Sequence, residues 1–419
     1  MFGINAQKPS YNPSRFFYGY IIVSAGFIVM TMTFGINYSF GVFFKPILAE
    51  FGWSRASASA AYSLMAIMSG FLGIFAGRLG DYFGPKFIGI LGGLFLGAGY
   101  LLLSQTQNIW HFYLFHGLVL SAGVGGCWPA LLPAVAKWFI ARRGLMTGIV
   151  ASGIGFGTFI HPPLAEWLIS NYGWRTAYFI IGLLTLVLVV GVSQFLKRDP
   201  QEIGQLPYGI ETVNGDKTVY EIGGHTFKEA IRTIQFWLLG TVYICYGYCL
   251  HTTMVHVAPH VQDMGFSAAH AARILATIGV TSIFARIIIG GASDRFGVKP
   301  SLIVGLLILA LSLLWVQIAT TLPLLYLFGI LFGFASGGVM SLQALAAGEL
   351  FGLRSLGIIL GTVAFLYTVG GALGAIISGY IFDVVGSYRP AFWVAEGISI
   401  LAFALTYLLR MPLRAKRPA

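Results

Sequence analysis

The chain has 419 residues, of which 57% are hydrophobic and only 9% are charged, and its formal net charge is +11. Soluble domains carry about 25% charged residues, so this composition excludes an ordinary soluble protein and predicts a chain that crosses the lipid bilayer several times. A positive charge can also indicate nucleic-acid binding. Here the basic residues cluster in loops between apolar segments, which favours the membrane and excludes nucleic acid as a partner.

Twelve apolar stretches are long enough to span a bilayer. We expect these helices near residues 18–44, 57–78, 86–105, 109–137, 143–169, 174–196, 233–260, 267–292, 299–319, 322–349, 355–382 and 388–409. A long polar segment lies between the sixth and the seventh. The sequence therefore predicts an all-α membrane protein with an N-terminal six-helix half (1–196), a linker (197–232) and a C-terminal six-helix half (233–419).

Lysine and arginine residues are distributed unevenly between the two sides of the predicted membrane. Most lie on the side that carries both termini and the linker. The opposite side holds Lys45, Arg55, Arg175, Arg273 and Arg389. Because basic loops stay in the cytoplasm, we expect both termini and the linker to be cytoplasmic, in a plasma (inner) membrane.

The two halves repeat each other at a constant interval of 213 residues, as between Asp81 and Asp294. The same interval relates Gly77 to Gly290, Gly84 to Gly297, Lys86 to Lys299, Pro46 to Pro259, Ser54 to Ser267, Gly148 to Gly361 and Gly157 to Gly370. A constant interval over several helices indicates duplication. Paired six-helix halves are typical of transporters, whose substrate site lies between the halves near the middle of the membrane.

Residues 77–86 (GRLGDYFGPK) and 290–299 (GGASDRFGVK) resemble the loop signature of the major facilitator superfamily, which follows helices 2 and 8. In that superfamily the aspartate caps a helix and pairs with a cation to close the cytoplasmic gate. The resemblance implies a gate made by Asp81, Asp294, Arg142 and Arg143. A charged turn that only anchors the loops is the alternative, and both roles can hold together.

A closer resemblance is to the monocarboxylate transporters and the bacterial oxalate/formate antiporters. It rests on residues 38–45 (YSFGVFFK), 137–153, 172–179 and 282–286 (SIFAR). It implies a secondary carrier, with a monomer as the functional unit, that moves small lactate- or pyruvate-like monocarboxylates together with a proton by alternating access. Anion exchange of the oxalate/formate type is an alternative, and a membrane sensor with a transporter fold is one from another class. The sequence carries no catalytic constellation, metal-ligand spacing or cofactor motif.

Arg286 lies inside an apolar stretch, residues 278–289. A cation at a bilayer centre costs about 2.5 to 3.5 kcal/mol on the mildest scale, which is tolerated where the charge faces a cavity and meets an anion. The resemblance places Arg286 at the family's carboxylate-binding arginine. A guanidinium binds one carboxylate through two hydrogen bonds, whereas a dianion would leave one charge unpaired. The alternative is a buried ion pair with Glu396, an acidic residue deep in a span.

Ser282 lies one turn before Arg286, on the same face of the helix, where the mammalian carriers have a proton-coupling aspartate. We expect it to bind the substrate or orient the guanidinium; a bond to its own helix is the alternative. Tyr38 and His251 are related by the 213-residue interval, so both are expected beside the cavity. Histidine titrates near neutral pH, which makes His251 a candidate proton carrier, unless a backbone carbonyl satisfies it.

Three further residues are candidates for the substrate site. Trp128 aligns with a cavity aromatic of the bacterial relatives, and Phe365 is expected to pack against the alkyl end of the substrate. Gln343 is a polar residue within a span, where such groups usually face the bundle interior. Ordinary packing between helices is the alternative for Phe365 and Gln343. The second cation of the oxalate antiporters corresponds to Val363, so the resemblance implies no dicarboxylate clamp.

Overall fold

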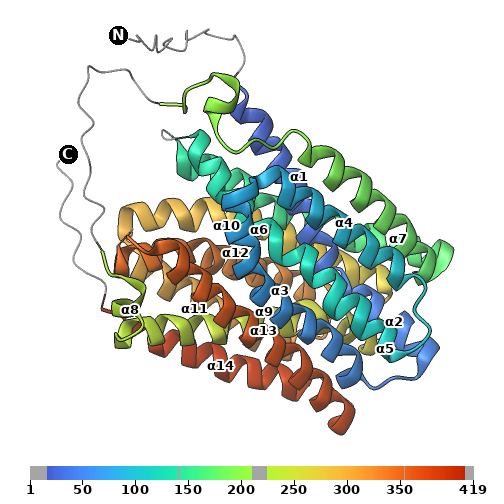
Figure 1. Cartoon of the computed structure of the whole chain (residues 1–419). Coiled ribbons are helices and arrows are strands. Elements are labelled where there is room, and N and C mark those ends of the chain that lie inside the picture. Colours follow the sequence, from blue (N-terminus) through green and yellow to red (C-terminus); the bar gives the residue numbers. More distant parts are fainter. Residues whose placement is uncertain (1–16, 140–141, 210–223, 353, 411–419) are drawn as a thin grey trace, which may run out of the picture.

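The computed structural model describes residues 17–139, 142–209, 224–352 and 354–410 as a bundle of long helices (Figure 1). The helices are α1 (Gly19–Asn37), α2 (Phe40–Phe51), α3 (Arg55–Phe83), α4 (Pro85–Leu103), α5 (Ile109–Phe112), α6 (Leu120–Trp138), α7 (Arg143–Ser193), α8 (Phe227–Ala230), α9 (Ile234–Asp263), α10 (Ala268–Phe296), α11 (Val298–Ile318), α12 (Leu322–Phe351), α13 (Leu356–Val385) and α14 (Arg389–Leu408). A π-helical segment, η1 (Tyr113–Val119), joins α5 to α6, and a short 3₁₀ turn, η2 (Pro200–Ile203), follows α7.

Ten segments of the described residues are long and apolar enough to cross a membrane. One of them, α7, contains two spans, because Gly173 adopts φ 78° and bends the helix there. The less apolar α9 runs alongside the others and supplies the twelfth span. The twelve-helix, all-α fold expected from the sequence is confirmed. The first span passes through the bend at Tyr38 and Ser39 into α2 and is longer than the predicted 18–44, since α2 continues to Phe51.

The helix boundaries repeat at the interval seen in the sequence. Ser54 directly precedes α3 and Ser267 directly precedes α10. Each side-chain oxygen accepts a hydrogen bond from a backbone N–H in the first turn, which is the usual role of serine at a helix N-cap. Gly84 and Gly297 end these helices with φ 84° and 96°, a conformation that glycine adopts without strain. The repeat agrees with two halves, whose boundaries stay a prediction.

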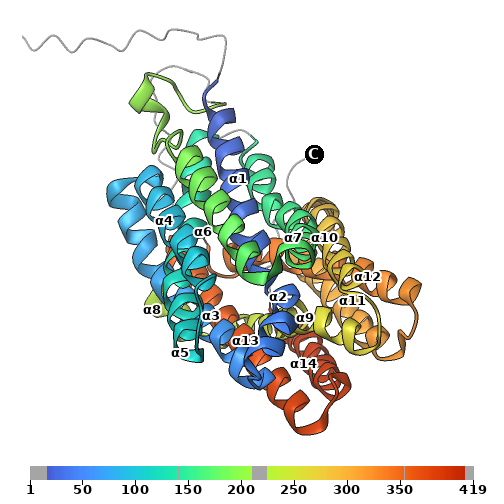
Figure 2. The ribbon, with the colours of Figure 1, turned by 90° about the vertical axis from the view of Figure 1, so that its right-hand side faces the viewer.

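The interior contains two hydrophobic cores, one built mainly by each half. The first surrounds Phe43 and Tyr178, whose rings stack 3.9 Å apart, and the second contains Tyr243 and Phe328. Between the halves, α7 packs beside α10 and α3 beside α13 (Figure 2). This arrangement places a seam between the halves along the bundle axis.

The described ends of the linker pair with both halves at equivalent positions. The Tyr208 N–H donates to the Trp138 carbonyl (2.9 Å), and the His225 N–H donates to the Phe351 carbonyl (2.8 Å). Trp138 and Phe351 are separated by 213 residues and end α6 and α12. We call this the linker end of the bundle; the opposite end, where α3 and α10 begin, is the distal end.

Candidate functional site

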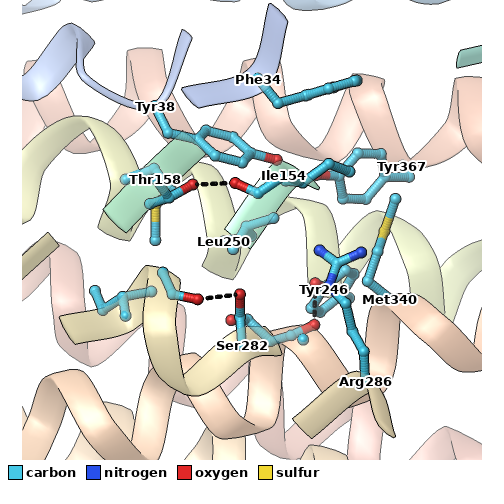
Figure 3. A pocket seen from close by; sticks show the side chains of 15 residues that line it. Phe34, Tyr38, Ile154, Thr158, Tyr246, Leu250, Ser282, Arg286, Met340 and Tyr367 are labelled. Carbon is cyan, nitrogen blue, oxygen red and sulfur yellow. Dashed lines mark hydrogen bonds between the residues drawn. The ribbon is translucent and has the colours of Figure 1, made fainter. Parts of the chain in front are cut away.

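A cavity lies between the two halves, and side chains from α1, α7, α9, α10, α12 and α13 line it (Figure 3). The lining residues are Phe34, Tyr38, Ile154, Thr158, Tyr246, Leu250, Met254, Ile278, Gly279, Ser282, Arg286, Ser336, Gly337, Met340 and Tyr367. The cavity therefore brings together three residues predicted from the sequence, Arg286, Ser282 and Tyr38.

Arg286 is the cation among these lining residues. Its Nη1 donates to the carbonyl oxygen of Ala151 on α7, 3.2 Å away, while its buried Nε has no hydrogen-bond partner. The phenol groups of Tyr246, Tyr38 and Tyr367 interact electrostatically with the Arg286 guanidinium. In the described part of the chain no carboxylate pairs with Arg286.

The ion-pair alternative for Arg286 is therefore not observed. Glu396 lies on α14, 8% exposed, and its Oε2 atom has no hydrogen-bond partner. The guanidinium instead faces tyrosine rings inside the cavity. A half-buried cation without a protein anion is costly, so a negatively charged ligand would stabilise this arrangement.

The hydroxyl groups of the cavity bond mainly to their own helices. Ser282 donates to the Gly279 carbonyl (2.8 Å), and Thr158 donates to the Ile154 carbonyl (2.9 Å). Ser282 thus makes the intrahelical bond that we stated as the alternative, although its oxygen can still accept a hydrogen bond.

His251 lies behind the cavity rather than among the lining residues. Its ring centroid is 5.3 Å from that of Tyr367, 5.7 Å from that of Tyr62 and 6.4 Å from that of Tyr38. The His251 Nδ1 contacts the Gly247 carbonyl at 3.0 Å, so a backbone partner satisfies one ring nitrogen. The predicted proximity of Tyr38 and His251 is present, while the proton-coupling role stays a prediction.

The other predicted substrate residues lie apart from the cavity lining in the described structure. The Phe365 ring packs against α3, where a Cβ at Gly70 would be 3.1 Å from it. Gln343 is 4% exposed, and its Nε2 has no partner. The side chain of Trp128 lies outside the described residues.

A four-residue spacing marks the cavity face of α1, α7, α9, α10 and α12. Ile278 and Arg286 lie one turn on either side of Ser282 on α10. The same spacing relates the lining residues Phe34 and Tyr38, Ile154 and Thr158, Ser336 and Met340, and Tyr246, Leu250 and Met254. The sequence analysis applied this spacing only to Ser282 and Arg286. Extending it from Tyr38 and Ser282 would have found Phe34 and Ile278, whereas Met340 lies four positions from no predicted site residue.

The predicted gate at the linker end is only partly described. Arg142 is exposed at the start of α7 with φ 61°, a left-handed conformation uncommon for residues other than glycine. The side chains of Asp81, Asp294 and Arg143 lie outside the described residues. The gate therefore stays a prediction.

Ion pairs link the two halves at the distal end. Asp263, the last residue of α9, binds Lys45 of α2 (2.6 Å) and Arg55 of α3 (2.7 Å). The Asp383 carboxylate accepts hydrogen bonds from the backbone N–H groups of Arg55 (2.8 Å) and Ala56 (2.7 Å), which caps α3 from the opposite half. These contacts close the distal end of the seam.

The comparisons with known proteins agree with this architecture. The chain is 29% identical over 394 residues to monocarboxylate transporter 13 of Rattus norvegicus, covering 92% of this chain and 87% of that protein. It is 26% identical to monocarboxylate transporter 12 of Xenopus laevis, and the match covers 96% of this chain and 90% of that protein. A similar fold is found in a solved structure of a bacterial homologue of the human lysosomal transporter Spinster, in an inward-facing and unoccupied conformation. The TM-score is 0.75 at 16% sequence identity, and the match covers 94% of this chain and 97% of that chain.

The family model described as Major Facilitator Superfamily matches residues 25–291 and 262–419. Together the two matches span both halves of the chain. The protein is a multi-pass membrane transporter and belongs to the major facilitator superfamily.

Proposed function

We propose that the protein carries monocarboxylates, the class that includes lactate and pyruvate, across a plasma membrane. The observation that supports this most directly is the Arg286 guanidinium, which faces the cavity without a protein carboxylate and with its Nε unpartnered. One planar cation matches one carboxylate. The names of the relatives, monocarboxylate transporters 12 and 13, support the same substrate class.

Alternating access accounts for the asymmetry between the two ends of the seam. The distal end carries the Asp263 ion pairs. Toward the linker end, ideal Cβ atoms at Gly144 and Gly148 of α7, and at Gly357 and Gly361 of α13, meet nothing within 4 Å. Glycines allow close approach of helices, so these positions give the halves room to close there. In the orientation that the basic loops favour, this conformation faces the cytoplasm.

Co-transport of a proton supports accumulation of the anion against the membrane potential, which opposes entry by about 2.3 kcal/mol per charge per 100 mV. His251 is our candidate carrier, because it is 6% exposed and its ring lies beside Tyr38 and Tyr367, which line the cavity. Electroneutral exchange of one anion for another is the alternative, and it requires no titrating group.

The test is uptake of labelled monocarboxylates into proteoliposomes, with and without an imposed pH gradient. Arg286→Lys keeps the charge but loses the two-pronged hydrogen bonding, so uptake should fall about a hundredfold while the variant remains folded. Wild-type uptake by this variant would reject the carboxylate role of Arg286. Uptake that requires a counter-anion and ignores the pH gradient would favour exchange.

A further inference from the structure

We propose that His256 binds a proton at the contact between the two halves and that its protonation opens the distal end of the bundle. His256 lies on α9, is fully buried and packs edge-on against Phe44 of α2, with ring centroids 5.6 Å apart. This site is separate from the cavity, and its proton is distinct from the coupling proton proposed for His251. The inference depends on the transporter fold and holds for any substrate.

The hydrogen bonds of His256 define its neutral state. Its Nε2 lies 2.8 Å from the Ala375 carbonyl oxygen of α13, and its Nδ1 lies 3.1 Å from the Tyr388 hydroxyl. A carbonyl oxygen only accepts hydrogen bonds, so Nε2 is the donor. In a neutral ring Nδ1 then accepts the hydrogen bond that the Tyr388 hydroxyl donates. A proton on Nδ1 removes this acceptor, and the hydroxyl loses the partner to which it donates.

The Tyr388 ring carries the effect of the proton to the first half through Arg55. Its centroid is 4.9 Å from that of His256 and 5.0 Å from the Arg55 guanidinium, which also lies 3.5 Å from the centroid of the Phe382 ring. Arg55 belongs to α3 of the first half, whereas Tyr388 and Phe382 belong to the second. A protonated His256 puts a second positive charge beside this tyrosine, and the two cations repel each other. Displacement of Arg55 in turn breaks its ion pair with Asp263.

The carboxylates around His256 already have other partners. The charged groups that interact electrostatically with the imidazole are Arg55 and Asp383. The Asp383 carboxylate accepts hydrogen bonds from two backbone N–H groups in α3, and Asp263 binds both Arg55 and Lys45. Among the described residues, neither aspartate forms an ion pair with His256. A charged imidazole therefore disturbs the contacts that close the distal end.

The burial of His256 couples its charge to the conformation of the protein. In the closed conformation a charged imidazole would be held away from water, which is costly. When Phe44 and Arg55 separate from the second half, water reaches the ring. The open conformation therefore binds the proton more tightly, and a ligand shifts a population toward the conformation that binds it better. Since histidine titrates near neutral pH, acid on the distal side should open the cavity to that side.

The experiment measures the distance between spin labels on cysteines replacing the exposed Trp110 and Trp393, without substrate. Samples at about pH 7.5 and about pH 5.5 span the titration of histidine and keep aspartate ionised. Without a further substitution, the ratio of open to closed populations should rise about tenfold at the lower pH, the size expected for a hydrogen bond to a charged group. His256→Gln keeps an amide donor for the Ala375 carbonyl but does not titrate, so its ratio should be the same at both pH values. The thermal midpoint at the higher pH checks folding, and His256→Asn repeats the measurement with a shorter amide.

His260→Gln is the matched control. His260 lies one turn later on α9, is 7% exposed and packs against Tyr388 with ring centroids 6.2 Å apart. It interacts electrostatically with Asp263 and Arg389, so its replacement should leave the response to acid unchanged. An unchanged acid response in His256→Gln, or its loss in His260→Gln, would overturn the proposal. Absence of any acid response without these substitutions would overturn it too. Because no substrate is present, all three results leave the proposed function standing.

Discussion

Asp263 and Arg55 form a two-point ion pair across the distal end of the bundle, with Nη1–Oδ2 at 2.7 Å and Nη2–Oδ1 at 3.2 Å. The residue equivalent to Asp263 in the first half is Glu50, 213 positions earlier. Glu50 binds Arg175 and the Trp174 indole within its own half. Two equivalent acids at the same end of the bundle thus have different roles, since one joins the halves and the other stabilises a single half.

Asp263→Asn should favour opening of the distal end, because it removes the charge that binds Arg55 and Lys45. The pair is partly exposed, 14% at Arg55 and 27% at Asp263, so the expected change is about 1 kcal/mol, or about fivefold in the ratio of open to closed populations. Spin labels on cysteines replacing the exposed Trp110 and Trp393 report the distance between the halves, which should shift to longer values.

Glu50→Gln is the matched control for this measurement. It removes an ion pair from the same end of the bundle and from the equivalent helix position. Since that pair stays within one half, the label distances should keep the wild-type distribution even if the thermal midpoint falls. Identical distributions for Asp263→Asn and wild type would show that the Asp263 ion pairs do not hold the distal end closed.

Gly155→Ala should disturb the site through the contact between α7 and α10. A Cβ at Gly155 would be 2.6 Å from the Ser282 Oγ and 2.8 Å from the Gly279 carbonyl oxygen. Relief of this overlap moves α7 away from α10 and costs about 1 to 3 kcal/mol. We expect a lower thermal midpoint and weaker stabilisation by substrate, measured by thermal unfolding with and without ligand.

Gly148→Ala provides the comparison, two turns away on the same helix. Its Cβ would meet nothing within 4 Å, and alanine favours the helix by about 1 kcal/mol over glycine. This variant should keep or raise the thermal midpoint in the distal-closed conformation. Equal destabilisation by both variants would mean that the close α7–α10 contact does not position the site.

His251→Asn tests the proton carrier. Asparagine keeps hydrogen-bonding capacity but does not titrate near neutral pH. If His251 carries the proton, accumulation driven by a pH gradient should fall about tenfold or more, whereas counterflow exchange should change little. His161 makes the same contact to the carbonyl four residues earlier, so His161→Asn is the control. Equal losses of accumulation and counterflow in His251→Asn would reject the coupling role.

The twelve spans and the repeat could be predicted from the sequence because they depend on local properties. Apolar length defines a span, and Ser54, Gly84 and their equivalents mark helix ends through capping and backbone conformation. The bend at Gly173 was also placed between two predicted spans. The extension of the first span beyond residue 44 to Phe51 was missed, because Lys45 and Glu50 suggested that the apolar segment had ended.

The site was predictable only where a residue is chemically unusual for its surroundings. Arg286 stands out as a cation in an apolar run, and Ser282 follows from its position on the same helix face. Phe365 and Gln343 have no such signature, since an aromatic or amide side chain on a spanning helix fits packing equally well. Which face of α12 or α13 meets the cavity depends on how the halves dock, and no single-helix pattern contains that information.

Met340→Lys tests whether one cation selects one carboxylate. Met340 lines the cavity with Arg286, so a lysine there adds a second positive charge where a second carboxylate would bind. Uptake of a dicarboxylate such as oxalate or malonate should become measurable, and KM for monocarboxylates should rise about tenfold, because the extra cation is left unpaired when one carboxylate is bound. Val363→Lys is the control, since Val363 is fully buried in the C-terminal core and is not a lining residue. That variant should lose stability without gaining dicarboxylate uptake. If Met340→Lys transports the original substrates unchanged and transports no dicarboxylate, the number of cations that line the cavity does not determine the charge of the substrate.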